Sequence, residues 1–204
     1  MIAIIDYGVG NLFSLRSSFK KIGVDAIVTS DKAQLQNAEK LLLPGVGAFE
    51  DAAKKLRESG LQDVLKEQVQ SGKYVMGICL GMQMLFEKSY EYGEHKGLGF
   101  LKGNVVPMKG VIDERLKVPH IGWNELLFTR EHFLFDGLKK GDCAYFVHSY
   151  YATDCQESVI AQAEYGKLLT AAVAKDNVLG CQFHPEKSGD VGLKILENFC
   201  KVKV

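Results

Sequence analysis

The feature that most constrains this chain is the segment 74–83, YVMGICLGMQ, in which an apolar run leads into a cysteine. Gly77 and Gly81 each lie two residues from Cys79. This spacing is typical of a sharp strand-to-helix turn that presents a nucleophile, because glycines keep Cβ atoms out of the crowded backbone. The turn also places the thiol at a helix N-terminus, where free N–H groups favour the thiolate. The segment therefore predicts acyl transfer through a thioester on Cys79.

A cysteine in this pattern has a second interpretation. Free cysteines are among the most buried residue types, and most are small core residues. The catalytic interpretation of Cys79 therefore depends on whether the chain also supplies a base and an orienting acid.

The first half of the chain alternates short apolar runs with segments of helical spacing. Such alternation is typical of an α/β fold with a mainly parallel, doubly wound sheet and helices on both faces. The predicted strands are residues 2–5, 25–29, 40–43 and 74–78, and the predicted helices are residues 12–22, 48–70 and 80–86.

The second half contains short runs of strand character, which predict an antiparallel extension of that sheet. No internal repeat, low-complexity tract or linker divides the sequence, so we expect one domain spanning residues 1–204. The predicted strands of this half are 104–108, 125–128, 144–150, 159–163, 169–175 and 178–183, followed by a helix at 189–202.

Charge and composition narrow the function. The 25 basic and 25 acidic residues give zero formal net charge, which argues against a broad nucleic-acid-binding surface. The apolar run at the N-terminus is too short to span a membrane, and no early segment has the order of a signal peptide. The five cysteines are widely spaced without a Cys-x-x-Cys pair, which argues against a disulfide framework or a zinc site. We expect a soluble, cytoplasmic protein without a metal or another cofactor.

The base is predicted at His184, which is followed by Pro185 and Glu186. The proline favours an extended backbone, in which residues two apart point to the same side, so the Glu186 carboxylate can orient the imidazole. Parallel strands end at a common edge, which would bring His184 close to Cys79. The alternative is an ordinary strand-end histidine with Glu186 capping the next helix. The other histidines, ranked lower as bases, are His95, His120, His132 and His148, the last of which we expect to line the cleft.

An acyl-transfer site also needs donors for the developing oxyanion. The N–H of Leu80, directly after the nucleophile, is the first candidate. The loop 44–47, PGVG, ends a predicted strand and can offer further backbone N–H groups. The alternatives are an ordinary Pro-Gly turn or a phosphate-binding loop, but the complete phosphate-loop patterns are absent from the sequence.

These motifs together resemble a known family over nearly the whole chain. The strings 77–83, GICLGMQ, and 183–186, FHPE, are similar to those of the class I, triad-type glutamine amidotransferases. Four further strings resemble, more narrowly, the glutaminase subunits of imidazole glycerol phosphate synthases. They are 6–11 (DYGVGN), 43–47 (LPGVG), 119–124 (PHIGWN) and 145–150 (YFVHSY).

The resemblance implies that Cys79 attacks the side-chain amide of L-glutamine and releases ammonia, and that water then hydrolyses the glutamyl thioester. His184 would act as base and then acid, with Glu186 as its orienting residue. The oxyanion hole would be lined by Leu80 with Gly47 or Val46. The implied substrate-binding residues are Gly45, Gln83, His148, Ser149 and Tyr150, although a solvated helix position is the commoner fate of a residue such as Gln83.

The resemblance also implies a partner, a (β/α)8-barrel cyclase that receives the ammonia in a heterodimer and makes imidazole glycerol phosphate for histidine biosynthesis. A glutaminase of this kind is expected to be slow until the cyclase is occupied. Trp123 is the only tryptophan and a candidate interface anchor, with a core tryptophan as the alternative. The candidate interface residues are Asn11, Pro119, Trp123, Asn124 and Lys187, of which Lys187 has a solvated loop charge as its alternative.

Three other functions compete with this interpretation. A related glutaminase could supply ammonia to a surface-sugar amidation pathway, because the catalytic motifs encode ammonia release alone. A cysteine hydrolase of similar architecture would not need Gln83 or the His-Pro-Glu order. A non-enzymatic binding subunit is disfavoured because nucleophile, base and acid are all present.

Overall fold

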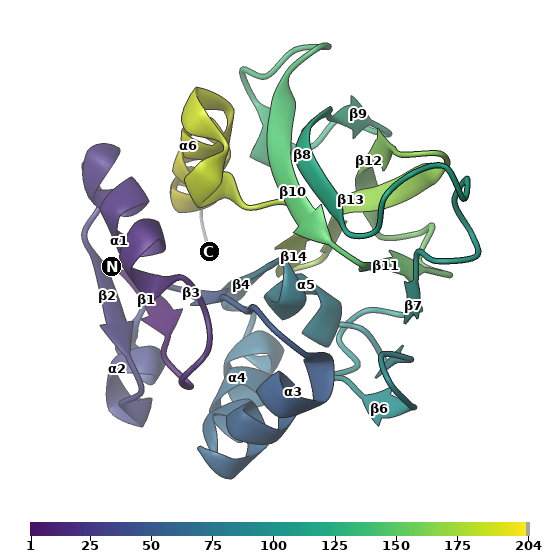
Figure 1. Cartoon of the computed structure of the whole chain (residues 1–204). Coiled ribbons are helices and arrows are strands. Elements are labelled where there is room, and N and C mark those ends of the chain that lie inside the picture. Colours follow the sequence, from purple (N-terminus) through teal and green to yellow (C-terminus); the bar gives the residue numbers. More distant parts are fainter. Residues whose placement is uncertain (203–204) are drawn as a thin grey trace.

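The computed structural model describes residues 1–202 and is built around an eight-stranded sheet with the order β2-β1-β3-β4-β14-β13-β12-β9 (Figure 1). The first five strands are parallel and the last three continue the sheet in antiparallel fashion. The parallel strands are β2 (Ala26–Thr29), β1 (Ile2–Ile5), β3 (Lys40–Leu43), β4 (Tyr74–Ile78) and β14 (Val178–Cys181). The antiparallel strands are β13 (Leu168–Lys175), β12 (Val159–Glu164) and β9 (Leu127–Phe128).

Helices cover both faces of the parallel part because its strands alternate buried side chains between two cores. Ile2 and Ile4 of β1 pack in one cluster with α1 (Leu12–Lys21) and α6 (Gly189–Lys201). Ala3 and Ile5 pack in the other cluster. The helices of that second face are α2 (Lys32–Asn37), α3 (Phe49–Glu58), α4 (Leu61–Gln70) and α5 (Leu80–Met84). The predicted fold class is therefore confirmed.

Two smaller sheets lie beside the antiparallel strands, in the half of Figure 1 away from the N-terminus. A two-stranded ribbon joins β10 (Cys143–His148) to β8 (His120–Glu125). A four-stranded sheet consists of β11 (Tyr150–Thr153), β7 (Asn104–Pro107), β5 (Lys88–Ser89) and β6 (His95–Lys96). Two single-turn 3-10 helices, η1 (Phe133–Phe135) and η2 (Pro185–Lys187), complete the described elements.

Several predicted boundaries are wrong. The single helix expected at 48–70 is two helices, because Gly60 adopts a left-handed conformation (φ 68°) between α3 and α4. The strand expected at 125–128 is shortened to β9, Leu127–Phe128, and the strand expected at 144–150 ends at His148. Strand β8 and helix α2 were not predicted at all.

Within residues 1–202, no helix is both long and apolar enough to cross a membrane.

Candidate active site

The turn at Cys79 has the strained geometry that its sequence predicts. Cys79 lies between β4 and α5 with φ 54° and ψ −112°, a region that residues with a Cβ rarely adopt. A Cβ on Gly77 would lie 2.6 Å from the carbonyl oxygen of Gly81, and a Cβ on Gly81 would overlap the carbonyl of Leu43. Both positions therefore require glycine, and the tight turn presents the Cys79 thiol at the carboxyl end of β4.

The topology brings His184 to this turn. Strands β4 and β14 are parallel neighbours, with Ile78 opposite Cys181, so the segments that follow both strands leave the sheet side by side. The backbone N–H of His184 donates to the carbonyl of Tyr145 on β10 at 2.9 Å. Its ring Nδ1 lies 2.8 Å from Oε1 of Glu186, and both side chains are almost completely buried. The backbone of His184 is thus held by β10 and its ring by the carboxylate at Nδ1, which leaves Nε2 as the nitrogen for proton transfer.

The charge of His184 is set by opposing effects. Burial lowers the pKa of this imidazole, but the hydrogen-bonding and charge interactions with Cys79 and Glu186 outweigh burial and raise the pKa to about 9. The imidazolium is therefore the favoured form at neutral pH. A cationic imidazole between a sulfur and a carboxylate can stabilise a thiolate and can deliver a proton to a leaving group.

The structure adds Gln182, which the sequence analysis did not select. Its side chain is 0% exposed and places Nε2 3.6 Å from the Cys79 sulfur, while its Oε1 accepts a hydrogen bond from Gln83 at 2.9 Å. Gln83 also donates to the carbonyl of Tyr150 at 3.1 Å. The available signal was the position of Gln182, two residues before His184, because alternate residues of an extended segment share one side.

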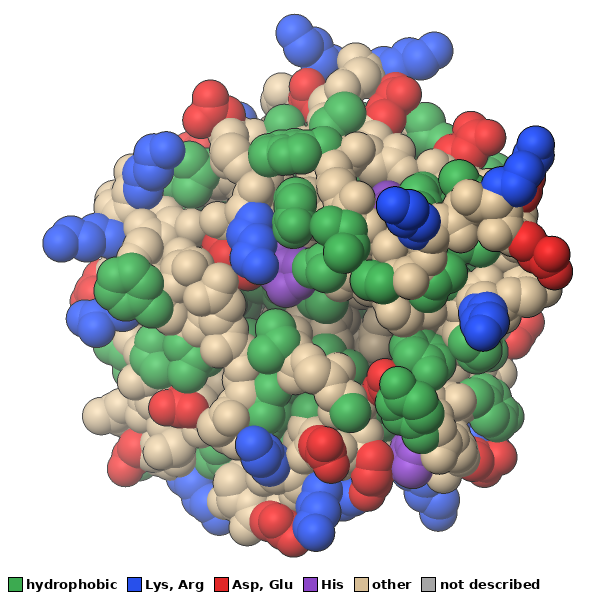
Figure 2. Space-filling view, in the orientation of Figure 1, with side chains coloured by type: hydrophobic (Ala, Val, Ile, Leu, Met, Phe, Trp, Pro, Cys, Tyr) green, Lys and Arg blue, Asp and Glu red, His purple; other side chains and the backbone are tan. Residues whose placement is uncertain are grey.

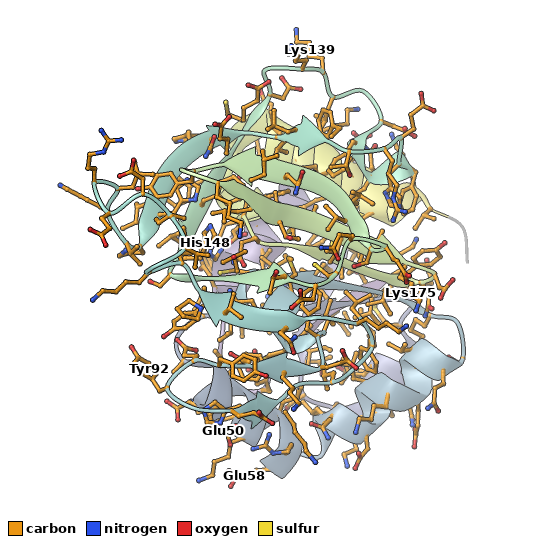
Figure 3. All side chains as sticks on the ribbon, turned by 90° about the vertical axis from the view of Figure 1, so that its right-hand side faces the viewer. Glu50, Glu58, Tyr92, Lys139, His148 and Lys175 are labelled. Atoms are coloured by element: carbon orange, nitrogen blue, oxygen red, sulfur yellow. The ribbon has the colours of Figure 1, made fainter. Side chains whose placement is uncertain are left out.

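Cys79 and His184 line a pocket of about 550 Å³, large enough for an amino acid. Figure 2, in the orientation of Figure 1, shows a hollow near the middle of the molecule, with hydrophobic side chains around its edge. Tyr92 and His148 also line the pocket, and Figure 3 places both on the same side of the molecule. The other lining residues are Val46, Gly47, Leu80, Gln83, Glu91, Pro107, Lys109, Val118, Pro119, Val147, Ser149, Tyr150 and Lys187.

Comparison with known proteins identifies the family. The model of the family described as "Glutamine amidotransferase class-I" matches residues 3–202. The chain belongs to this family. A relative from Sulfurimonas denitrificans, 52% identical over 100% of this chain and 99% of its own length, is named "Imidazole glycerol phosphate synthase subunit HisH". A relative with the same name from Caldanaerobacter subterraneus is 50% identical and covers 98% of this chain and 97% of its own length.

Solved structures agree on the fold of this amidotransferase. A structure entitled "Crystal structure of glutamine amidotransferase" has a TM-score of 0.76 at 23% identity and covers 98% of this chain and 100% of its own. The glutaminase domain of a Trypanosoma brucei CTPS has a TM-score of 0.67 at 14% identity and covers 100% of this chain and 94% of its own. At these identities the likeness concerns the fold alone.

The loop 44–47 of this amidotransferase lies beside the nucleophile. Tyr7 anchors it, since the buried phenol donates to the carbonyl of Pro44 at 2.6 Å. Val46 and Gly47 line the pocket, and Gly47 has a φ of 89°. Gly45 packs against the backbone of the α5 start, where a Cβ would lie 2.6 Å from the nitrogen of Gly81, and it is not among the lining residues.

Two buried histidines are in contact at the end of β10, and of the two His148 lines the pocket. His148 lies 6% exposed at the end of β10, and its ring Nδ1 is 2.8 Å from the carbonyl of Tyr150. Its other nitrogen is 3.1 Å from Nδ1 of His120, whose ring stacks on that of Tyr165. Burial is the main cause that lowers the pKa of His148 to about 4 and also lowers that of His120. Both rings are therefore neutral hydrogen-bonding groups at pH 7, unlike His184.

The residues predicted to face a partner have different environments. Trp123 is 58% exposed, so its alternative interpretation as a core residue is wrong. Lys187 lines the pocket with its Nζ 5.8 Å from the centre of the Tyr145 ring. Asn124 directs its amide inward, to the carbonyl of Glu164 and the ring of His120. Pro119 lines the pocket, and Asn11 is half-buried at the start of α1.

Residues 1–202 contain no group of three His, Cys, Asp or Glu side chains arranged to hold a metal ion. All five cysteines are free. Cys155 and Cys181 are buried, and burial raises the pKa of both thiols.

Proposed function

We propose that this chain is the glutaminase subunit of an imidazole glycerol phosphate synthase, which hydrolyses L-glutamine and supplies ammonia for histidine biosynthesis. The observation that carries the proposal is the Cys79–His184–Glu186 constellation, of which Cys79 and His184 line the pocket. The names of relatives at 52% and 50% identity over almost the full chain support the choice of synthase.

The first half of the proposed reaction forms a thioester. The Cys79 thiolate attacks the side-chain amide carbon of glutamine, and the carbonyl electron pair moves onto oxygen. When the tetrahedral intermediate collapses, the C–N bond breaks. His184 donates its proton to the departing nitrogen, which leaves as ammonia.

The second half regenerates the thiolate. Water attacks the thioester carbon and gives a proton to the now neutral His184. Collapse breaks the C–S bond, returns the electron pair to the sulfur of Cys79 and releases glutamate. Glu186 holds Nδ1 of His184 throughout, so Nε2 faces the reacting atoms in both halves.

The oxyanion of both tetrahedral intermediates needs donors that do not move away during the reaction. We assign this role to the N–H of Leu80 together with Val46 or Gly47 of the loop 44–47. Tyr7 supports the loop by holding the carbonyl of Pro44.

The glutamine substrate is proposed to lie along the α5 and β10 sides of the pocket. Gln83 is fixed by its bonds to Tyr150 and Gln182, and its amide oxygen has no donor among the described residues. That oxygen is available to accept from a substrate amino group. The other proposed substrate-binding residues are Gly45, His148, Ser149 and Tyr150, of which Gly45 would act from behind the loop.

The proposed partner is a (β/α)8-barrel cyclase that receives ammonia in a heterodimer. Val118, Ile121 and Trp123 are large, exposed apolar residues at or next to the pocket, a pattern typical of protein interfaces. Burying this rim under a partner would close the pocket against water and keep ammonia from escaping. The proposed contacts are Asn11, Pro119, Trp123, Asn124 and Lys187. The free cysteines fit a protein that works in the reducing cytoplasm.

A diazo-ketone analogue of glutamine tests the substrate. In the chain assembled with its cyclase, the reagent should alkylate Cys79, and excess L-glutamine should protect it. Cys143, a partly exposed free thiol of the same chain, is the internal control and should remain unlabelled. Labelling located by peptide mass spectrometry at Cys143 but not at Cys79 would contradict the proposal. Complementation of a histidine auxotroph distinguishes histidine synthesis from a surface-sugar pathway.

A further inference from the structure

Gln182 is buried against the nucleophile in a way that its neighbours enforce. It follows β14, its backbone N–H donates to the carbonyl of Ala171 at 2.8 Å, and its side chain is inaccessible to solvent. The amide lies between the sulfur of Cys79, 3.6 Å from Nε2, and the amide of Gln83, 2.9 Å from Oε1. Because buried polar groups are normally hydrogen-bonded, the role of this amide depends on whether its NH2 or its oxygen faces the sulfur.

The orientation of the amide follows from a backbone carbonyl. The oxygen of Tyr150 can only accept, so the group that Gln83 directs at it must be the NH2. The second hydrogen of that NH2 is donated to Gln182, so the atom of Gln182 that accepts it must be the amide oxygen, Oε1. The remaining end of Gln182, its own NH2, therefore faces the sulfur. This chain of donors excludes the flipped amide.

The other groups at the sulfur leave room for such a donor. The titratable groups that face it are Tyr7, Cys181 and His184, while β10 presents the carbonyl of Val147 at 4.0 Å. Burial raises the pKa of both Tyr7 and Cys181, so both are neutral at pH 7. Among the side chains at the sulfur, His184 and Gln182 are thus the two that can stabilise its negative charge.

We propose that Gln182 is a further catalytic residue, whose amide N–H donates a hydrogen bond to the Cys79 thiolate. The inference rests on the proposed function for its role in turnover. The sulfur is negative before attack and again when the C–S bond of the thioester breaks and the electron pair returns to it. It is neutral in the thioester, so the donor favours release of the thiolate, and no proton leaves Gln182 in either step.

The test is the pH dependence of alkylation of Cys79 by iodoacetamide in the full-length chain, followed by peptide mass spectrometry. Gln182→Leu removes the donor, and Gln182→Glu keeps the shape of the side chain but replaces the NH2 with oxygen. If one of the two variants does not fold, the other still tests the proposal. Asn198→Leu is the matched control, because Asn198 is a buried amide bonded only to the carbonyls of Leu134 and Asp136.

In both Gln182 variants the alkylation midpoint should rise by about one pH unit, which is about a tenfold fall in the ionisation constant of the thiol, while Asn198→Leu leaves the midpoint unchanged. An unchanged midpoint in a folded Gln182 variant, or an equal rise in Asn198→Leu, would overturn the proposal. The readout needs no glutamine. A shifted midpoint in a chain whose wild-type complex does not hydrolyse glutamine would support the donor and overturn the proposed function.

Discussion

The charge of His184 is the property of a single residue on which the proposed chemistry most depends. Its pKa is raised to about 9 from 6.5, so the imidazolium stabilises the folded state fully below about pH 6.5, and this stabilisation is lost as the pH rises through about 9. Cys79 and Glu186 interact with this imidazole, so the three groups gain and lose protons together.

Glu186→Gln should move the alkaline limb of the pH profile of kcat/KM to lower pH, because one of the two groups that raise the pKa of His184 is removed. We expect a fall of roughly 100-fold at pH 8, smaller than for loss of the nucleophile. Glu197→Gln, at a partly exposed carboxylate on α6 that is paired with Lys194 and Lys201, is the control and should leave the profile unchanged. An alkaline limb that stays in place in Glu186→Gln would contradict the role given to this carboxylate.

Gly81→Ala should destabilise the protein by about 3 kcal/mol, because the new Cβ would overlap the carbonyl of Leu43. Gly23→Ala is the comparison, since Gly23 has a φ of 73° in open space and should lose only about 1 kcal/mol from backbone strain. Urea unfolding measures both free energies. Equal losses would show that backbone strain, rather than the close approach at the turn, decides the result.

At the scale of elements, the β8–β10 ribbon connects the outer surface to the catalytic groups. The inner side of β10 accepts the N–H of His184 at Tyr145 and presents the carbonyl of Val147 to the sulfur. The outer side of β8 carries Ile121 and Trp123. A partner that binds the outer side therefore contacts a ribbon whose strand β10 holds the backbone of the base, His184.

Trp123→Ala should weaken binding of the cyclase by about 2 kcal/mol, because a large exposed aromatic side chain is typical of an interface hot spot. The free energy of unfolding of the isolated chain should change little. Leu168→Ala, at an exposed apolar residue of β13 that does not line the pocket, is the matched control for binding measured by calorimetry. Equal affinities for Trp123→Ala and wild type would remove Trp123 from the proposed interface.

The same elements explain what the sequence could predict. Strands such as β1 and β3 are apolar on both faces because both faces are buried, and their boundaries were found almost to the residue. Strand β8 was missed because its buried member is His120 and its outward members are Ile121 and Trp123, the reverse of the usual pattern. The break at Gly60 was missed because apolar residues continue at helical spacing on both sides of it.

The candidate site was predictable where its residues form short motifs. Cys79 lies in a glycine-flanked turn and His184 in a His-Pro-Glu string. The parallel pairing of β4 and β14 then brings the two motifs to the same edge of the sheet. Gln182 was not predictable in this way. Its significance comes from contacts with Cys79 and Gln83 that are distant in the sequence, and a glutamine is exposed far more often than it is buried.

At the scale of the whole molecule, the proposal describes a chain that makes ammonia for another protein. Hydrolysis without a partner would waste glutamine, so we expect the isolated chain to hydrolyse glutamine at least tenfold more slowly than the chain assembled with cyclase and its nucleotide substrate. A coupled assay for glutamate measures both rates. Equal rates would contradict gating by the partner.

The central claim is that ammonia for the synthase comes from a thioester on Cys79, and the Cys79→Ala variant tests it most directly. In the reconstituted complex, synthesis of imidazole glycerol phosphate is measured once with L-glutamine and once with an ammonium salt as the nitrogen source. The account predicts that the variant loses synthesis from glutamine and retains synthesis from ammonium. Retained synthesis from glutamine, or loss of both activities, would contradict it.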